Sequence, residues 1–200
     1  MNQDEPTCQR CYNTFMKNLL AIFFVIACVG CSSMSSPIPN DGGKFRQHNE
    51  GYSLLYKLVS DDGDVDKIFI LKHADDSVKA LIKEIAAYMQ SARKQMDEFR
   101  KSDRGLDYGV SDLPAIEQRS RDLQAGDERS ALLFSGGETF ELRLIFTQTE
   151  AMNYATQLAK SLAEREDDPN RKKFLDDVAK RCGAFHERLM NLLSVKAGAA

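Results

Sequence analysis

The histidines of the chain limit the metal chemistry that it could support. A carboxylate-bridged di-iron site in a helical bundle needs Glu-x-x-His on two helices. None of the three histidines, His48, His73 and His186, has a Glu three positions before it. The sequence therefore predicts no di-iron centre, no metal site and no cofactor.

Three polar residues remain weak candidates for a ligand or metal site. Glu141 and Gln148 are seven residues apart on one expected helix, and His186 follows Phe185 in the last helix. They could hold an ion or small ligand inside a bundle. We favour the alternative, in which Glu141 is solvated in a first turn and stabilised by the helix dipole, while Gln148 fixes the register. His186 is then a partly buried structural histidine.

Other reactive residue types have simpler explanations. Cys182 occupies an apolar position and is expected to act as a small hydrophobe. The run 61–64 (Asp-Asp-Gly-Asp) has one acidic residue where a calcium loop needs three, which favours a turn and a helix cap. The charged run 164–168 is expected to be a solvated helix face. We find no catalytic signature and predict a protein that is not an enzyme.

Composition favours one folded domain that does not bind nucleic acid. The chain has 200 residues, 42% of them hydrophobic and 28% charged. Its 27 basic and 30 acidic residues give a net charge of −3, so no strongly basic face is expected.

The amino-terminal region resembles the signal of a bacterial lipoprotein. Lys17 precedes an apolar run, 19–29, which is shorter than the about 20 residues that a membrane span needs. Gly30 and Cys31 follow, so we expect cleavage before Cys31 and acylation of Cys31, with Cys28 as the alternative. Residues 1–30 are then a signal peptide, in which 1–15 could be an over-called start.

The segment that follows the cleavage site predicts a tethered protein. Residues 31–48 begin with the lipidated cysteine and are rich in Ser, Pro and Gly, which is typical of a flexible tether. Acyl chains on Cys31 would make membrane lipid a permanent partner. Ser32 follows Cys31, which favours sorting to the outer membrane, facing the periplasm, over the inner membrane.

Three long helices follow from apolar spacing. From 78 to 99 apolar residues alternate at four and three positions without a miss. A second helix is expected over about 138–166, and a third begins at Asp168-Pro169. The short connection between these two predicts an antiparallel αα-hairpin.

Two regions complete the predicted fold. Residues 50–73 fit a broken helix better than a β-hairpin, although both remain possible, and 103–137 form a long crossover. The prediction is an all-α, ferritin-like four-helix bundle over 49–196, made of two αα-hairpins joined by that crossover. Residues 197–200 are expected to be a disordered tail.

The bundle region is similar to a ferritin-like family of predicted bacterial outer-membrane proteins of unknown function. The resemblance spans about residues 50–195. Histidines common in that family are replaced here by Arg93 and Ala151, and only His186 matches. The matching segments are Asp66-Lys67-Ile68, Val78-Lys79, Ile85-Ala86, Ser135-Gly136-Gly137, Phe140-Glu141 and Phe185-His186.

We therefore expect a non-enzymatic scaffold or interaction module of the cell envelope. The alternative is a metal- or small-ligand-binding bundle with a degenerate site. The expected partner is an unidentified envelope protein, and spare helix faces leave a homo-oligomer open.

Overall fold

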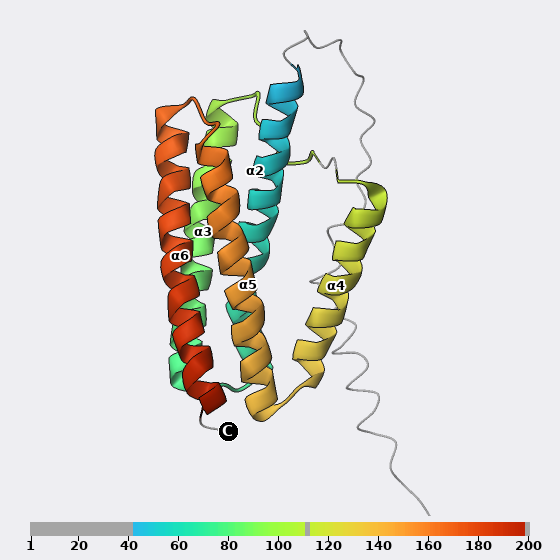
Figure 1. The fold of residues 1–200 in the computed structure, drawn as a ribbon, viewed down its shortest axis with the longest axis vertical. Helices are drawn as coiled ribbons and strands as arrows, with labels where there is room; N and C mark the ends of the chain where they lie inside the picture. The colour runs from blue at the N-terminus through green and yellow to red at the C-terminus, as the bar shows by residue number, and fades with distance from the viewer. Residues whose placement is uncertain (1–41, 111–112, 199–200) are drawn as a thin grey trace, which may run out of the picture. The chain divides into compact units, whose positions relative to one another are not determined.

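The computed structural model describes residues 42–110 and 113–198, and all regular structure in these ranges is helical (Figure 1). The prediction of an all-α fold is therefore confirmed for the described part of the chain. Five α-helices and one 3-10 helix follow one another there: α2 (Gly42–Asp62), η1 (Val65–Ile70), α3 (Asp76–Ser102), α4 (Ala115–Phe134), α5 (Gly137–Ala163) and α6 (Pro169–Gly198).

The α5–α6 hairpin is the most extensive packing unit of this bundle. The predicted start of the last helix at Pro169 is confirmed. Helix α5 ends at Ala163, three residues before the expected end, and leaves a short turn that carries Glu166. This turn places α6 beside α5 in the antiparallel direction, as Figure 1 shows.

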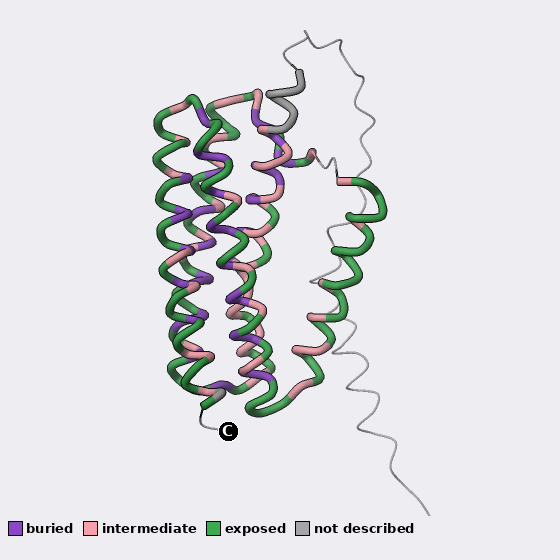
Figure 2. The backbone as a smooth tube through the Cα atoms, in the orientation of Figure 1, coloured by how far each residue is buried: buried purple, intermediate pink, exposed green. Residues whose placement is uncertain are grey.

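The core lies between α2, α3, α5 and α6. Figure 2 shows buried positions along the facing sides of these helices. The predicted apolar stripe of α3 is buried from Val78 to Met96, and Phe99 packs partly buried against the core. The stripe of α6 is likewise buried from Leu175 to Leu189. Burial of such side chains contributes roughly 1.5–3 kcal/mol each before entropic costs.

Residues 50–73 form the end of α2 and η1, so the helical prediction is confirmed and the β-hairpin alternative is wrong. Helix α2 approaches α5 closely at Gly51. A Cβ atom at this position would lie 2.5 Å from Leu162 Cδ2, which is closer than real Cβ atoms come. Only glycine therefore allows this approach without a shift of Leu162.

Two predicted boundaries need correction. Helix α2 begins at Gly42, so the flexible tether expected through residue 48 cannot include 42–48. Asn49 and Tyr52 of this helix are buried. At the other end α6 continues to Gly198, two residues into the expected tail. The predicted signal peptide and lipidated cysteine lie outside the described residues.

The segment between α3 and α5 contains a fifth helix that the four-helix prediction does not include. Helix α4 stands to one side of α5 in Figure 1, and none of its residues is buried. Its apolar residues are too sparse to form a continuous stripe, so it gains little from packing.

Within the described ranges, we find no helix with an apolar stretch long enough to cross a bilayer.

Candidate functional site

Glu141 lies at the end of the bundle where α3 and α5 begin and α6 finishes. Its Oε1 accepts a 2.6 Å hydrogen bond from the backbone N–H of Asp75, the residue that precedes α3. Its Oε2 pairs with Lys196 of α6, and Lys196 also pairs with the Asp75 carboxylate. These bonds raise the pKa of Lys196. Glu141 is buried, so the prediction of a solvated first-turn residue is wrong.

An open pocket of about 510 Å3 lies over this cluster. Lys72 at its rim donates a 2.9 Å hydrogen bond to the carbonyl oxygen of Ser135. The pocket joins charges of both signs to an apolar wall, an arrangement that fits a small polar ligand. It is lined by Leu71, Lys72, His73, Asp75, Gly137, Glu138, Phe140, Glu141 and Lys196.

Gln148 lies two turns further along α5 and contacts the last residue of α2. Its Nε2 donates a 3.1 Å hydrogen bond to Asp62 Oδ1. Its Oε1 is buried without a hydrogen-bond partner. Burial and the neighbouring Asp61 raise the pKa of Asp62 to about 6, although the bond from Gln148 acts in the opposite direction. The register role predicted for Gln148 fits this contact between α2 and α5.

His186 and Cys182 lie on α6, away from the Glu141 pocket. His186 is partly buried, and its Nδ1 lies 3.7 Å from Oε1 of the adjacent Glu187. Cys182 is fully buried. Burial, with smaller contributions from Asp62 and Asp177, raises the pKa of its thiol to about 12. The thiol is therefore protonated at neutral pH and is a poor nucleophile.

The structure does not bring the three weak candidates together. Glu141 pairs with Lys196 and Gln148 with Asp62, while His186 lies beside Glu187. Among the described residues, no group of three or more His, Cys, Asp or Glu side chains could hold a metal ion.

The best-connected polar cluster is at the opposite end of the bundle, around Glu166, and the sequence did not reveal it. We call it the Glu166 network: Glu166, His48, Tyr52, Arg171 and Asp103. The buried Glu166 carboxylate accepts a 2.6 Å hydrogen bond from Tyr52 Oη. It also lies 3.0 Å from His48 Nε2. The expectation that 164–168 is simply a solvated face is wrong for Glu166.

Arg171 completes this network. Its Nε and Nη2 donate two 3.0 Å hydrogen bonds to the two oxygens of Glu166, and its Nη1 donates a 2.8 Å bond to Asp103. Burial alone would raise the pKa of Glu166, but the bonds from Arg171 and Tyr52, with a backbone bond from Asp168, lower it to about 2. Tyr52 lies on α2, Asp103 follows α3, and Arg171 lies in the first turn of α6, so the bonds of the network join these three helices. Bonds between charged groups of this kind are stronger than neutral ones.

An aromatic group extends this contact toward α3. Tyr108 stacks on Tyr56 with ring centroids 4.9 Å apart. The Arg100 guanidinium carbon lies 5.5 Å from the centroid of the Tyr56 ring and 5.4 Å from that of the Tyr108 ring. The Tyr108 hydroxyl donates a 2.9 Å hydrogen bond to the carbonyl of Met96. The loop after α3 is thereby fixed against α2. The sequence shows tyrosines at 52, 56 and 108, but their separation along the chain gives no sign that they pack together.

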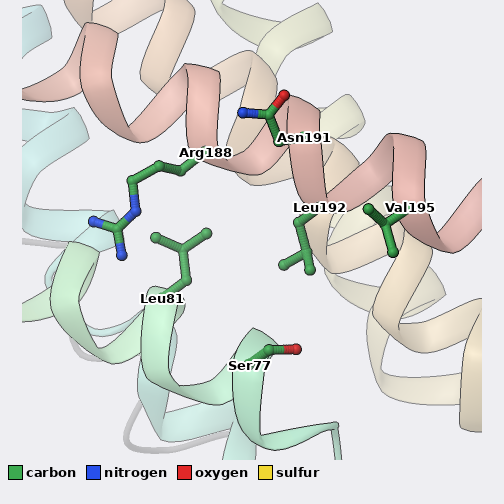
Figure 3. Close-up of a pocket in the computed structure, with 6 residues that line it drawn as sticks. All are labelled: Ser77, Leu81, Arg188, Asn191, Leu192 and Val195. Atoms are coloured by element: carbon green, nitrogen blue, oxygen red, sulfur yellow. The ribbon is translucent and has the colours of Figure 1, made fainter.

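A second open groove, of about 350 Å3, runs between α3 and α6. Figure 3 shows Leu81 of α3 and Leu192 of α6 between the two helices, with Val195 near one end. Arg188 lines the groove and pairs with Glu84 at 2.7 Å. The groove is mostly apolar and offers few groups that could orient a ligand.

Comparisons with known proteins give a likeness of fold. The chain superposes on the crystal structure of a DUF305 protein from Streptomyces coelicolor, described as a candidate secreted protein, with a TM-score of 0.62. The match covers 75% of this chain and 94% of that chain at 17% sequence identity, so it supports the helical fold alone. No protein-family model and no curated protein matches the sequence.

Proposed function

We propose that this chain is a lipid-anchored protein of the bacterial cell envelope that acts as a non-enzymatic scaffold or interaction module. The anchor is proposed from the signal-like run ending in Cys31 and from the small residue before it. Ser32 supports the outer membrane, with the bundle facing the periplasm. A ferritin-like arrangement of α2, α3, α5 and α6 is part of the same proposal.

The exposed apolar residues of α4 are the observation that supports an interaction role best. This helix leaves four large apolar side chains in solvent: Ile116, Leu123, Leu133 and Phe134. A helix that buries none of its own residues contributes little to the stability of the fold. Its exposed apolar side chains are of the kind that protein–protein contacts cover.

The anchor is tested by labelling the full chain with an alkyne fatty acid in a Gram-negative host. We expect label in the natural chain and in Cys28→Ser, and loss of label in Cys31→Ser. Loss only in Cys28→Ser would move the anchor to that residue. Label retained in both single variants and in the double variant would overturn the anchored part of the proposal.

The interaction role is tested by a photo-crosslinking residue placed at Leu123 of the full chain in cells. We expect adducts with an envelope protein or with this chain itself. The same crosslinker at Lys173, an exposed position on α6, serves as the control. Equal adduct patterns at the two positions, or none at Leu123, would count against a role for α4.

A small-ligand-binding role remains the second candidate because a buried Glu141 lines the open pocket beside Lys196. Native mass spectrometry of the full chain, purified under mild conditions, tests it. Binding predicts a discrete excess mass that Glu141→Ala removes and His186→Ala retains. No excess mass in the natural chain, or the same excess mass in all three proteins, would reject this candidate.

A further inference from the structure

The contact between α2 and α5 leaves one buried oxygen atom without a hydrogen-bond partner. Gln148 of α5 is 5% exposed, and its Nε2 donates a 3.1 Å hydrogen bond to Oδ1 of Asp62, the last residue of α2. The other polar atom of the same amide group, Oε1, is buried and has no partner among the described residues. A buried acceptor without a donor costs free energy, which a bound ligand can recover.

The unpartnered oxygen lies beside the Asp62 carboxylate. Within an amide group the oxygen and nitrogen are about 2.2 Å apart, so Gln148 Oε1 lies no more than about 5.3 Å from Asp62 Oδ1. Gln148 is buried, whereas Asp62 is only partly buried, so solvent can reach the carboxylate. The two groups are therefore close enough for one small ion or one water molecule to contact both.

The acidic turn at the end of α2 leaves one of its charges without a cation. Lys57 pairs with Asp61 at 3.4 Å. Lys67 pairs with Asp64 at 2.8 Å. Asp62 pairs with no basic side chain of the described residues, and its hydrogen-bond donor is a neutral amide. The last turn of α2 also carries no basic residue, although the carboxyl end of a helix attracts cations. The charge of Asp62 is thus the one in this turn that nothing neutralises.

We propose that Asp62 and Gln148 bind a small monovalent cation, Na+ or K+, between α2 and α5. Its single positive charge would match the single carboxylate, and its contact with Oε1 would occupy the unpartnered amide oxygen. Carboxylate and carbonyl oxygens are the ligands that hard cations prefer. Carbonyl oxygens and helix carboxyl ends coordinate alkali ions in channels and transporters. Water would complete the coordination of the ion from the open side of Asp62.

Other occupants fit these two groups less well. A water molecule could donate to both oxygens, but it would neutralise no charge. A Ca2+ ion takes six to eight oxygen ligands and usually more than one carboxylate, whereas one carboxylate faces Gln148 here. The pKa of Asp62, raised to about 6, agrees with a charge that lacks a cationic partner in the chain itself. This inference goes beyond the proposed function and depends on neither the anchor nor α4.

The test is thermal unfolding of the full chain at pH 8, where Asp62 is ionised, followed by circular dichroism in different chloride salts. Ionic strength is kept at about 0.15 M in every buffer, so that screening is equal. We expect a Tm about 2–4 °C higher in NaCl or KCl than in tetramethylammonium chloride, whose cation is too bulky to enter.

Three variants locate the effect. Asp62→Asn removes the charge and Gln148→Met removes the amide oxygen, so each should abolish the difference in Tm between the salts. Asp61→Asn is the matched control, because Asp61 is the exposed neighbour that already pairs with Lys57, and it should retain the full difference. Any general loss of stability in Gln148→Met acts in all salts and does not enter the comparison.

Sodium-23 NMR of the same proteins measures binding directly. We expect the natural chain and Asp61→Asn to broaden the sodium signal, added KCl to reverse the broadening, and Asp62→Asn to lose it. Equal Tm values in the sodium, potassium and tetramethylammonium salts would overturn the cation and leave water as the partner of Gln148. A salt difference retained in Asp62→Asn would also overturn it, because the ion would then act elsewhere. Stabilisation by MgCl2 or CaCl2 alone would reject a monovalent ion.

Discussion

Two carboxylates inside the same bundle have opposite electrostatic environments. Glu166 receives donors from Tyr52 and Arg171, and its pKa falls to about 2. Asp62 receives one amide donor from Gln148, and its pKa rises to about 6. Burial penalises the charged form of both carboxylates, so the number and charge of the hydrogen-bond donors decide whether the pKa falls or rises. The Glu166 network stabilises the charged form of its carboxylate, whereas the surroundings of Asp62 destabilise the charged form.

The largest expected effect is the loss of the Glu166 carboxylate. Glu166→Ala leaves the Arg171 guanidinium partly buried without its main partner. Breaking a buried pair in this way costs about 3–5 kcal/mol. We expect the free energy of unfolding, measured by urea denaturation, to fall by that amount. Glu164→Ala, on an exposed residue of the same turn, is the control and should cost under about 0.5 kcal/mol.

The second largest expected effect is a fall in the free energy of unfolding when acid protonates Glu166. Its folded pKa lies below the ordinary value of 4.5, so its contribution is complete above pH 4.5 and disappears as pH falls toward 2. We expect a loss of about 2–3 kcal/mol over this range, measured by urea denaturation at successive pH values. Glu166→Gln should flatten that slope. A slope unchanged in Glu166→Gln would show that other carboxylates cause the acid sensitivity.

The hydrogen bond of Tyr52 should have a smaller effect. Tyr52→Phe removes a 2.6 Å donor from a buried carboxylate, and such bonds contribute about 1.5–3 kcal/mol. Tyr56→Phe removes a 2.9 Å bond to the partly exposed Asp97 and should cost about 0.5 kcal/mol. Thermal unfolding of the two variants measures the difference. Equal losses would mean that the Glu166 network is no stronger than an ordinary surface contact.

The smallest expected effect has the opposite sign. Because the folded pKa of Asp62 is raised, its ionisation weakens the fold as pH rises through about 6. Asp62→Asn should therefore raise the free energy of unfolding at pH 8 by about 1–2 kcal/mol and change it little at pH 4. Asp61→Asn is the exposed neighbour for comparison. A loss of stability at pH 8 in Asp62→Asn would contradict the inference that the charged form of Asp62 destabilises the fold.

Apolar periodicity predicted most of the bundle from the sequence. The stripes of α3 and α6 are nearly uninterrupted, and Pro169 marks a helix start, so these elements followed from local rules. Helix α4 could not be placed in this way, since its sparse apolar residues indicate no packing partner. The start of α2 was also missed, because Ser, Pro and Gly upstream suggested a tether that continued to His48.

The polar contacts were much less predictable than the helices. Glu141 and Gln148 were identified as unusual by their seven-residue spacing, but their partners Lys196 and Asp62 lie 55 and 86 positions away. Glu166 stood in an acidic run that resembled a solvated surface. Its burial depends on His48, Tyr52 and Arg171 arriving from two other helices. Periodicity describes which face of a helix is apolar, but it does not describe such long-range pairs.

The wide sequence separation within the Glu166 network has a consequence for folding kinetics. Its bond from Tyr52 to Glu166 spans 114 positions, whereas α5 and α6 meet through a short turn. Closing a long loop costs entropy before its contacts form, so the α5–α6 hairpin should assemble early and the Tyr52 contact late. Tyr52→Phe should then accelerate unfolding and leave the refolding rate nearly unchanged, the signature of a contact absent from the transition state.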